Sequence, residues 1–426
     1  MKFSICGLGC KVNTYEAESI ASSLEKRGYE RVAFEEPADV SLIFTCAVTN
    51  TAAQKSRQMM HRVRRLNPQA VVAMVGCYAQ VRPQEMADAD LIIGTAHKQE
   101  IPQILETYRR EQGPLMLVDT APAQKFTPLL TDQFEHQTRA YLKIQDGCNQ
   151  FCSYCVIPYA RGRERSMDPE TACQEAVRLS GHHHEIVLAG IHTGRYGREY
   201  GLSLAGLLKR MLAAAPEVQR FRISSIEVTE VDDELLELMQ NDRRIARHLH
   251  IPLQAGCDSV LARMNRPYNT AQYYDRIKAV RERIPDVSIS CDLITGFPGE
   301  REEDFEAGYE FLKKCGFSFL HVFPFSLREG TKAETMPDQV PVEIRRQRAR
   351  QCIQLSDQLY DAYKDCWIGK TAEVLAETEA DGETFGHSSQ YLPVHISGHC
   401  PHGEITKVRI RERRGHELYA ERGGQE

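Results

Sequence analysis

The sequence predicts an α/β protein of three parts: an N-terminal parallel-sheet α/β domain, a central partial (β/α)6 barrel and a small C-terminal β-barrel. Apolar strand segments alternate with helical segments through most of the 426 residues, a pattern typical of parallel sheets covered on both faces. Six strand–helix units follow one another in the middle of the chain, and short strands separated by turns fill its last part. We expect the domains at residues 1–112, 138–366 and 367–426, with a connector at 113–137.

The N-terminal domain is expected to repeat a strand, a turn that contains Gly or Cys, and a helix. The expected strands are residues 2–6, 40–45, 70–75 and 91–94. Cys10, Cys46 and Cys77 each follow one of the first three strands, and the carboxyl ends of parallel strands lie along one edge of a sheet. Three thiolates at one edge can hold an iron–sulfur cluster. Three separately buried cysteines are the alternative, but their equivalent positions in three units favour the cluster.

The central part is expected to begin with a strand at residues 139–145. Five more strands are expected at residues 185–190, 220–227, 248–253, 287–294 and 320–325. Cys148, Cys152 and Cys155 follow the first strand with the spacing C-x3-C-x2-C. This spacing lets one loop present three thiolates to a [4Fe–4S] cluster and leaves one iron for a substrate's donor atoms. A structural zinc site would need four protein ligands.

The formal net charge of −6 excludes a uniformly basic nucleic-acid binder, and the basic residues are instead concentrated in two places. Residues 40–84 contain no Asp or Glu. The strand expected at 404–411 places its basic side chains on one face together with Arg413, and this face is either a phosphate-binding strip or solvated surface. The candidate RNA contacts are Arg57, Arg62, Arg64, Arg65, Lys407, Arg409 and Arg411.

The chain has 14 cysteines, and its start lacks the apolar core of a secretory signal. No apolar segment of the sequence is long enough to cross a membrane. We therefore expect a cytoplasmic protein with no membrane partner, whose thiols are reduced and serve metal binding or catalysis rather than disulfides.

The C-x3-C-x2-C loop after the first barrel strand resembles that of the radical S-adenosylmethionine (SAM) enzymes. Three segments are similar to the cysteine motifs of the methylthiotransferase N-terminal domain: LGCKVN at 8–13, FTCAVTN at 44–50 and GCYAQ at 76–80. Four segments are similar to the barrel motifs of the same family: GIHTG at 190–194, SSIE at 224–227, HIPLQ at 250–254 and GFPGE at 296–300. The C-terminal strands resemble the TRAM domain, an RNA-binding small barrel.

The resemblance implies an enzyme that uses two [4Fe–4S] clusters, with SAM as both methyl donor and radical source. It implies that one cluster is bound by Cys10, Cys46 and Cys77. The other would be bound by the catalytic residues Cys148, Cys152 and Cys155. The implied SAM contacts are Tyr154, Gly190, Ser225, Glu227 and Gln254. The implied partners are tRNA, an electron donor of flavodoxin or ferredoxin type and a sulfur source, but not DNA.

Members of the family act on isopentenyladenosine in tRNA, on threonylcarbamoyladenosine in tRNA, or on an aspartate of a ribosomal protein. The sequence KVN at 11–13, followed by YEAE at 15–18, most resembles the threonylcarbamoyladenosine group, whereas the other two groups usually have QMN and PKN there. The expected reaction is therefore 2-methylthiolation of N6-threonylcarbamoyladenosine at position 37 of tRNA. The other two substrates remain alternatives, as does a non-catalytic iron–sulfur protein that binds RNA; reductive cleavage of SAM would distinguish an enzyme from that protein.

Overall fold

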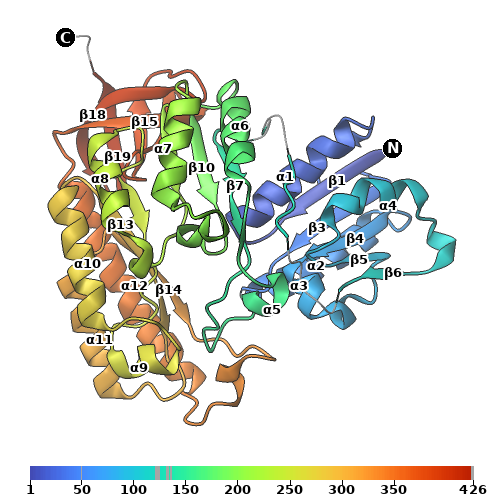
Figure 1. Cartoon of the computed structure of the whole chain (residues 1–426), viewed down its shortest axis with the longest axis horizontal. Helices are drawn as coiled ribbons and strands as arrows, with labels where there is room; N and C mark the ends of the chain where they lie inside the picture. Colours follow the sequence, from blue (N-terminus) through green and yellow to red (C-terminus); the bar gives the residue numbers. More distant parts are fainter. Residues whose placement is uncertain (49, 120–124, 131–133, 135–136, 424–426) are drawn as a thin grey trace.

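The computed structural model describes residues 1–48, 50–119, 125–130, 134 and 137–423. It contains the three expected parts (Figure 1). The N-terminal unit, blue to cyan, lies on one side of the central domain, which is green to orange, and the small C-terminal barrel, red, packs at another end of that domain. None of the described helices is long and apolar enough to cross a membrane.

The N-terminal unit is a six-stranded parallel sheet with helices on both faces. Its strand order is β2-β1-β3-β4-β5-β6. The strands are β1 (Lys2–Gly7), β2 (Glu30–Arg31), β3 (Val40–Thr45), β4 (Val71–Gly76), β5 (Leu91–Ile93) and β6 (Leu115–Leu117). The helices are α1 (Lys11–Glu25), α2 (Asn50–Leu66), α3 (Cys77–Val81) and α4 (Ile101–Thr107). One buried cluster joins α1 and α4 to the sheet, and a second joins α2 and α3 to its other face.

The edge strand β6 lies within the segment expected to be a connector. It pairs in parallel with β5, so the sheet extends past the boundary expected at residue 112. The short apolar run Leu115–Leu117 shows no periodicity in the sequence and becomes a strand because β5 offers it an open edge. The connector prediction for residues 120–124, 131–133, 135 and 136 falls outside the described residues.

The central domain is an open half-barrel of six parallel strands, as expected. Two sheets, β11-β10-β7 and β12-β13-β14, meet at a parallel bridge between Phe221 and Ile245. The strands are β7 (Ala140–Lys143), β10 (Glu185–Ala189), β11 (Arg220–Ile223), β12 (His248–His250), β13 (Ser288–Thr295) and β14 (Phe319–Pro324). A short antiparallel pair lies beside them, β8 (Gln145–Asp146) and β9 (Arg165–Ser166).

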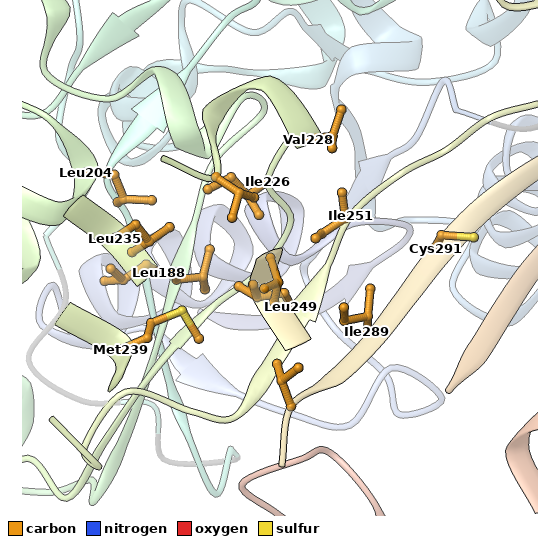
Figure 2. Close-up of a cluster of buried hydrophobic side chains, with 14 of the residues drawn as sticks. Leu188, Leu204, Ile226, Val228, Leu235, Met239, Leu249, Ile251, Ile289 and Cys291 are labelled. Atoms are coloured by element: carbon orange, nitrogen blue, oxygen red, sulfur yellow. The ribbon is translucent and has the colours of Figure 1, made fainter. Parts of the chain in front are cut away.

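Helices cover the outer face of the half-barrel. They are α6 (Pro169–Ser180), α7 (Leu204–Ala214), α8 (Asp233–Asn241), α9 (Asp258–Arg263), α10 (Thr270–Arg283), α11 (Glu302–Cys315) and α12 (Val342–Asp365). One large buried cluster holds them to the strands. Figure 2 shows Leu188 of β10 and Leu249 of β12 among its side chains, with Leu235 of α8. Because apolar packing occupies the helix side, polar side chains gather on the inner face and at the strand ends. The short helix α5 (Ile157–Arg161) instead packs against the N-terminal unit, where Ala160 joins the cluster of α2 and α3.

The C-terminal part is a closed barrel of order β15-β16-β17-β19-β18. Its strands are β15 (Thr371–Ala380), β16 (Glu383–Ser388), β17 (Pro393–Ser397), β18 (Ile405–Arg414) and β19 (Glu417–Arg422). The expectation that Arg413 shares a face with the other basic residues of β18 is wrong. The register of β18 shifts between Ile410 and Glu412, because a bulge interrupts strict alternation. The Arg413 guanidinium instead donates to Asp365 of α12, at 2.7 Å.

A buried ion cluster fixes the small barrel to the half-barrel. Glu185 of β10 accepts hydrogen bonds from Arg220 and Arg222 at 2.9 and 2.8 Å. Arg222 also donates to the carbonyl oxygens of Ser388 and Ser389, each at 3.1 Å. The barrel is therefore held against the amino-terminal ends of β10 and β11 by directional contacts.

A second buried ion cluster joins the N-terminal unit to the half-barrel. Glu16 of α1 accepts from Lys143 of β7 at 2.7 Å and from Arg161 of α5 at 2.9 Å. Lys98 of the N-terminal unit also pairs with Glu16. Asp146 of β8 pairs with Lys143 and Arg161. These groups are almost completely buried, so the orientation of the two units depends on them.

Candidate active site

The three N-terminal cysteines lie together at the carboxyl edge of the sheet, as the sequence predicts. Cys10 precedes α1, Cys46 follows β3 and Cys77 begins α3. A Cβ atom placed on Gly9 would lie 2.5 Å from the Cys46 sulfur, and Gly9 has φ +96°. Burial, with smaller contributions from the neighbouring thiols of Cys10 and Cys77, raises the pKa of Cys46 to about 12. The bare backbone of Gly9 is therefore what lets the Cys10 turn pack against Cys46.

The second triad lies on the loop that follows β8. Burial raises the pKa of Cys148 and of Cys155 to about 12, and the Cys152 thiol adds to both shifts. Gly147 starts the loop with φ +72°, and a Cβ atom there would lie 2.0 Å from the Arg163 carbonyl oxygen. The loop therefore requires glycine immediately before its first cysteine.

The donor atoms of both triads fit an iron–sulfur cluster. Among the described residues, no group of three or more His, Cys, Asp or Glu side chains is gathered closely enough to hold a metal ion. A four-iron cluster sets a different requirement, because its cysteines bind separate iron atoms. Each triad offers three free thiols, which matches a cluster with one iron left open.

Arg161 connects the two triads, and the sequence analysis did not identify it. Its Nε donates to the sulfur of Cys77 at 3.0 Å, and its side chain is completely buried. Arg161 ends α5, the short helix directly after the second triad. A cation of the half-barrel therefore contacts a thiol of the N-terminal triad. No spacing in the sequence predicts this contact.

Two further side chains contact the half-barrel triad. Arg266 donates to the Cys152 sulfur at 3.3 Å and also pairs with Glu227. The Nδ1 atom of His192 lies 3.4 Å from the Cys148 sulfur. A buried cation next to a thiol stabilises its thiolate form, so Arg266 suits a metal-binding Cys152.

A cavity of about 560 Å³ lies where the three parts of the chain meet. The N-terminal unit contributes Gly9, Cys10, Lys11 and Val12 to its walls. The half-barrel contributes Gly190 and Ser225, which follow β10 and β11, and the strand residues His248 and Asp292. The small barrel contributes Tyr391. Its volume is within the range of small-molecule sites, about 300–1,000 Å³.

A smaller cavity of about 180 Å³ lies between the two triads. Ala47 and Val48, which follow Cys46, form one wall, and Cys155 forms part of the other. Arg328 also lines this cavity and donates to the Ala47 carbonyl oxygen. Asp292 lines both cavities, so they are adjacent.

The five residues expected to contact SAM do not share one cavity. Gly190 and Ser225 line the large cavity, and Tyr154 and Gln254 line the small one. Glu227 lines neither of these and pairs with Arg266. Gln254 has φ +69°, an unfavourable conformation for a residue with a side chain, and such strain is concentrated at functional sites.

The candidate RNA contacts differ in how free their charges are. Three arginines of the acid-free segment pair with carboxylates from outside it: Arg57 with Glu85, Arg62 with Glu35 and Arg64 with Asp90. Arg411 pairs with Glu421. Arg65, Lys407 and Arg409 are exposed, and none of their three side chains has a hydrogen bond or ion pair to the residues that the structure describes.

Comparisons with known proteins agree with the two cysteine-bearing parts. Residues 2–94 match the family model described as uncharacterized protein family UPF0004. Residues 142–312 match the model of the radical SAM superfamily. Among solved structures, the radical SAM methyltransferase TsrM from Kitasatospora setae has a TM-score of 0.57 at 15% identity, covering 78% of this chain and 74% of that one; this likeness concerns the fold alone.

Three curated relatives extend the similarity to almost the whole chain. The threonylcarbamoyladenosine tRNA methylthiotransferase MtaB of Bacillus subtilis is 41% identical, over 95% of this chain and 92% of its own length. The protein of the same name from Aquifex aeolicus is 35% identical, over 96% of this chain and 100% of its own length. The tRNA-2-methylthio-N(6)-dimethylallyladenosine synthase of Moorella thermoacetica is 34% identical, over 96% of this chain and 95% of its own length.

Proposed function

Because this chain belongs to the family of radical SAM tRNA methylthiotransferases, we propose that it attaches a methylthio group to N6-threonylcarbamoyladenosine of tRNA. The observation that carries the proposal is the large cavity, which is lined by the N-terminal triad residue Cys10, by the half-barrel and by the small barrel. The small cavity, lined by Cys155, is adjacent to it. A base held in the large cavity would therefore have one triad on each side.

We propose that each triad holds one [4Fe–4S] cluster and that SAM binds at the half-barrel cluster. The bound groups would supply hydrogen abstraction from an unactivated aromatic C–H bond, which no side-chain acid or base can achieve at neutral pH. The chain's own residues position them: Arg161 holds Cys77, and Arg266 holds Cys152 and Glu227. We also propose that the enzyme takes its electrons from a donor of flavodoxin or ferredoxin type and its sulfur from a separate sulfur source.

We propose that the small barrel, residues 367–426, binds the tRNA outside the cavity. Lys407 and Arg409 are exposed on β18, and their side chains have no ion pair within the described part of the chain. Barrel residues such as Tyr391 also line the large cavity. The barrel can therefore contact the RNA backbone while it contributes to the wall around the modified base.

Nucleoside analysis tests the substrate. Mass spectrometry of tRNA from cells that lack the protein should show no 2-methylthio derivative of threonylcarbamoyladenosine, and the protein should restore it. Loss of the dimethylallyl derivative instead would favour the activity named for the Moorella thermoacetica relative. If the nucleosides of tRNA are unchanged in cells that lack the protein, and the purified protein does not cleave SAM, the result would favour a non-catalytic RNA-binding protein. Loss of the modification of a ribosomal-protein aspartate would instead identify that aspartate as the substrate.

The Gly9→Ala variant should lose the iron of the N-terminal triad, about half of the total. The new Cβ atom would lie 2.5 Å from the Cys46 sulfur, a distance that forces the turn and the thiol apart. Iron per chain after anaerobic reconstitution measures the effect, while reductive SAM cleavage should persist. Gly28→Ala is the matched control, because Gly28 also has a positive φ, +82°, with nothing within 4 Å. Full iron content in Gly9→Ala, or equal loss in Gly28→Ala, would contradict this role.

Replacing Lys407 and Arg409 together with alanine should weaken tRNA binding and flatten its dependence on salt by about two units of slope, because each phosphate contact releases a counterion. Arg411→Ala should have a smaller effect, since Glu421 already neutralises that guanidinium. Titrations of tRNA at several salt concentrations measure both quantities. An unchanged affinity and slope in the double variant would remove β18 from the RNA interface. Arg65 would then be the remaining candidate whose side chain has no ion pair among the described residues.

A further inference from the structure

Lys11 places an ammonium group at the wall of the large cavity. It is the first residue of α1 and follows Cys10. Its ammonium group has no hydrogen bond or ion pair to any residue that the structure describes, although its side chain is only partly exposed. His248 and His321 line the same cavity. Burial lowers the pKa of both, and the charge of Lys11 contributes to that shift, so the ammonium group lies within electrostatic range of their rings.

The surroundings do not neutralise this charge. Burial, with the nearby charges of Arg222 and Arg139, lowers the pKa of Lys11 to about 8, so the ammonium form still predominates at neutral pH. Glu185 acts in the opposite direction, but its carboxylate is already held by Arg220 and Arg222. Asp292 is the one acidic residue among the described residues that line the cavity, and it pairs with His250 at 3.3 Å. The amino-terminal end of α1 adds the partial positive charge of a helix dipole at the same wall. The cavity therefore suits a ligand with a negative group.

We propose that Lys11 binds the carboxylate of the threonyl group of the substrate and so selects threonylcarbamoyladenosine over dimethylallyladenosine. The inference rests on the proposed function, because it takes its two competing substrates from the relatives. A threonylcarbamoyl group carries a carboxylate, whereas a dimethylallyl group is an uncharged hydrocarbon. Closing the cavity over the hydrocarbon would bury the Lys11 ammonium without a partner, which is costly. One side chain thus favours one substrate and opposes the other.

The experiment uses the reconstituted enzyme and three anticodon stem-loop RNAs. They carry N6-threonylcarbamoyladenosine, the same nucleoside with its carboxylate converted to a carboxamide, and N6-dimethylallyladenosine. For the charged RNA, Lys11→Gln should lower both affinity and kcat/KM by about 10- to 100-fold, the value of one hydrogen bond between charged groups. For the carboxamide RNA the change should stay below about twofold. Lys11→Arg should keep the preference for the charged RNA.

Lys2→Gln is the matched control, because Lys2 lies at the surface of the same unit and pairs with Glu30. Iron content and SAM cleavage without RNA are measured for both variants, Lys2→Gln and Lys11→Gln, and affinities and rates are compared per assembled cluster. The wild-type enzyme alone gives a test that does not depend on the folding of a variant. Equal affinity for the carboxylate and carboxamide RNAs would overturn the proposal, as would an equal loss on both in Lys11→Gln. Wild-type activity on the dimethylallyl RNA alone would instead overturn the proposed function.

Discussion

Replacing Cys148, Cys152 and Cys155 together with alanine should abolish the formation of 5′-deoxyadenosine and remove about four of about eight irons per chain. The three thiols lie on one loop between β8 and α5, and no other described cysteine is placed to substitute for them. Iron and sulfide analysis after anaerobic reconstitution measures the first effect. Chromatography of the products of SAM under strong reductant measures the second. The variant should retain the iron of the N-terminal triad.

The complementary variant separates the roles of the two triads. Replacing Cys10, Cys46 and Cys77 should also remove about half of the iron, but it should leave reductive SAM cleavage partly intact while methylthio transfer stops. Cys366→Ala is the control, because Cys366 is exposed and lies outside both triads. If the first variant keeps all its iron, the assignment of its ligands is wrong. If the second abolishes SAM cleavage in folded protein, the division of roles is wrong.

The positions of the cysteines could be predicted because they depend on local patterns. Cys46 and Cys77 directly follow apolar strands, Cys10 follows a strand across a short turn, and parallel strands end at a common edge. The loop of Cys148 needs only its own spacing. The fold was predictable for the same reason, except for the short strands β2, β6, β8 and β9. The three residues of β6, for example, form a strand only because β5 is beside them.

The charged groups around the site could not be predicted, because their partners are distant in the sequence. Arg161 contacts Cys77 and Glu16, which are 84 and 145 positions away. The acid-free segment appeared to be a basic surface, but folding brings Glu35 and Asp90 to two of its arginines. Composition within a window reports the charge that a segment contains, not the charge that remains after tertiary pairing.

The Glu16→Gln variant should lower the free energy of unfolding by about 3–5 kcal/mol, the usual cost of removing one partner from a buried ion pair. Lys98 is 4% exposed, and Glu16 is its carboxylate partner in the described structure. Lys143 and Arg161 would then have to share one carboxylate, that of Asp146. Urea denaturation at neutral pH measures the loss. Because Glu16 joins the N-terminal unit to the half-barrel, the variant should also weaken the contact between the two cysteine triads and slow methylthio transfer.

The pH dependence of stability distinguishes this cluster from surface ion pairs. Although burial alone would raise the pKa of Glu16, the cations of Arg161, Lys143 and Lys98 hold it well below its usual value. A carboxyl group whose pKa is lowered by folding stabilises the protein above its unfolded pKa of about 4.3, and this contribution disappears as the pH falls. The difference in stability between wild type and Glu16→Gln should therefore shrink in acid.

The matched control is Glu106→Gln, because Glu106 pairs with Arg27 at the surface of the same unit, with 48% of its side chain exposed. Solvent screens such a pair, so its loss should cost no more than about 1 kcal/mol. Equal destabilisation by the two substitutions would show that the buried cluster contributes no more than a surface pair. It would also leave the orientation of the N-terminal triad toward the half-barrel to apolar packing alone.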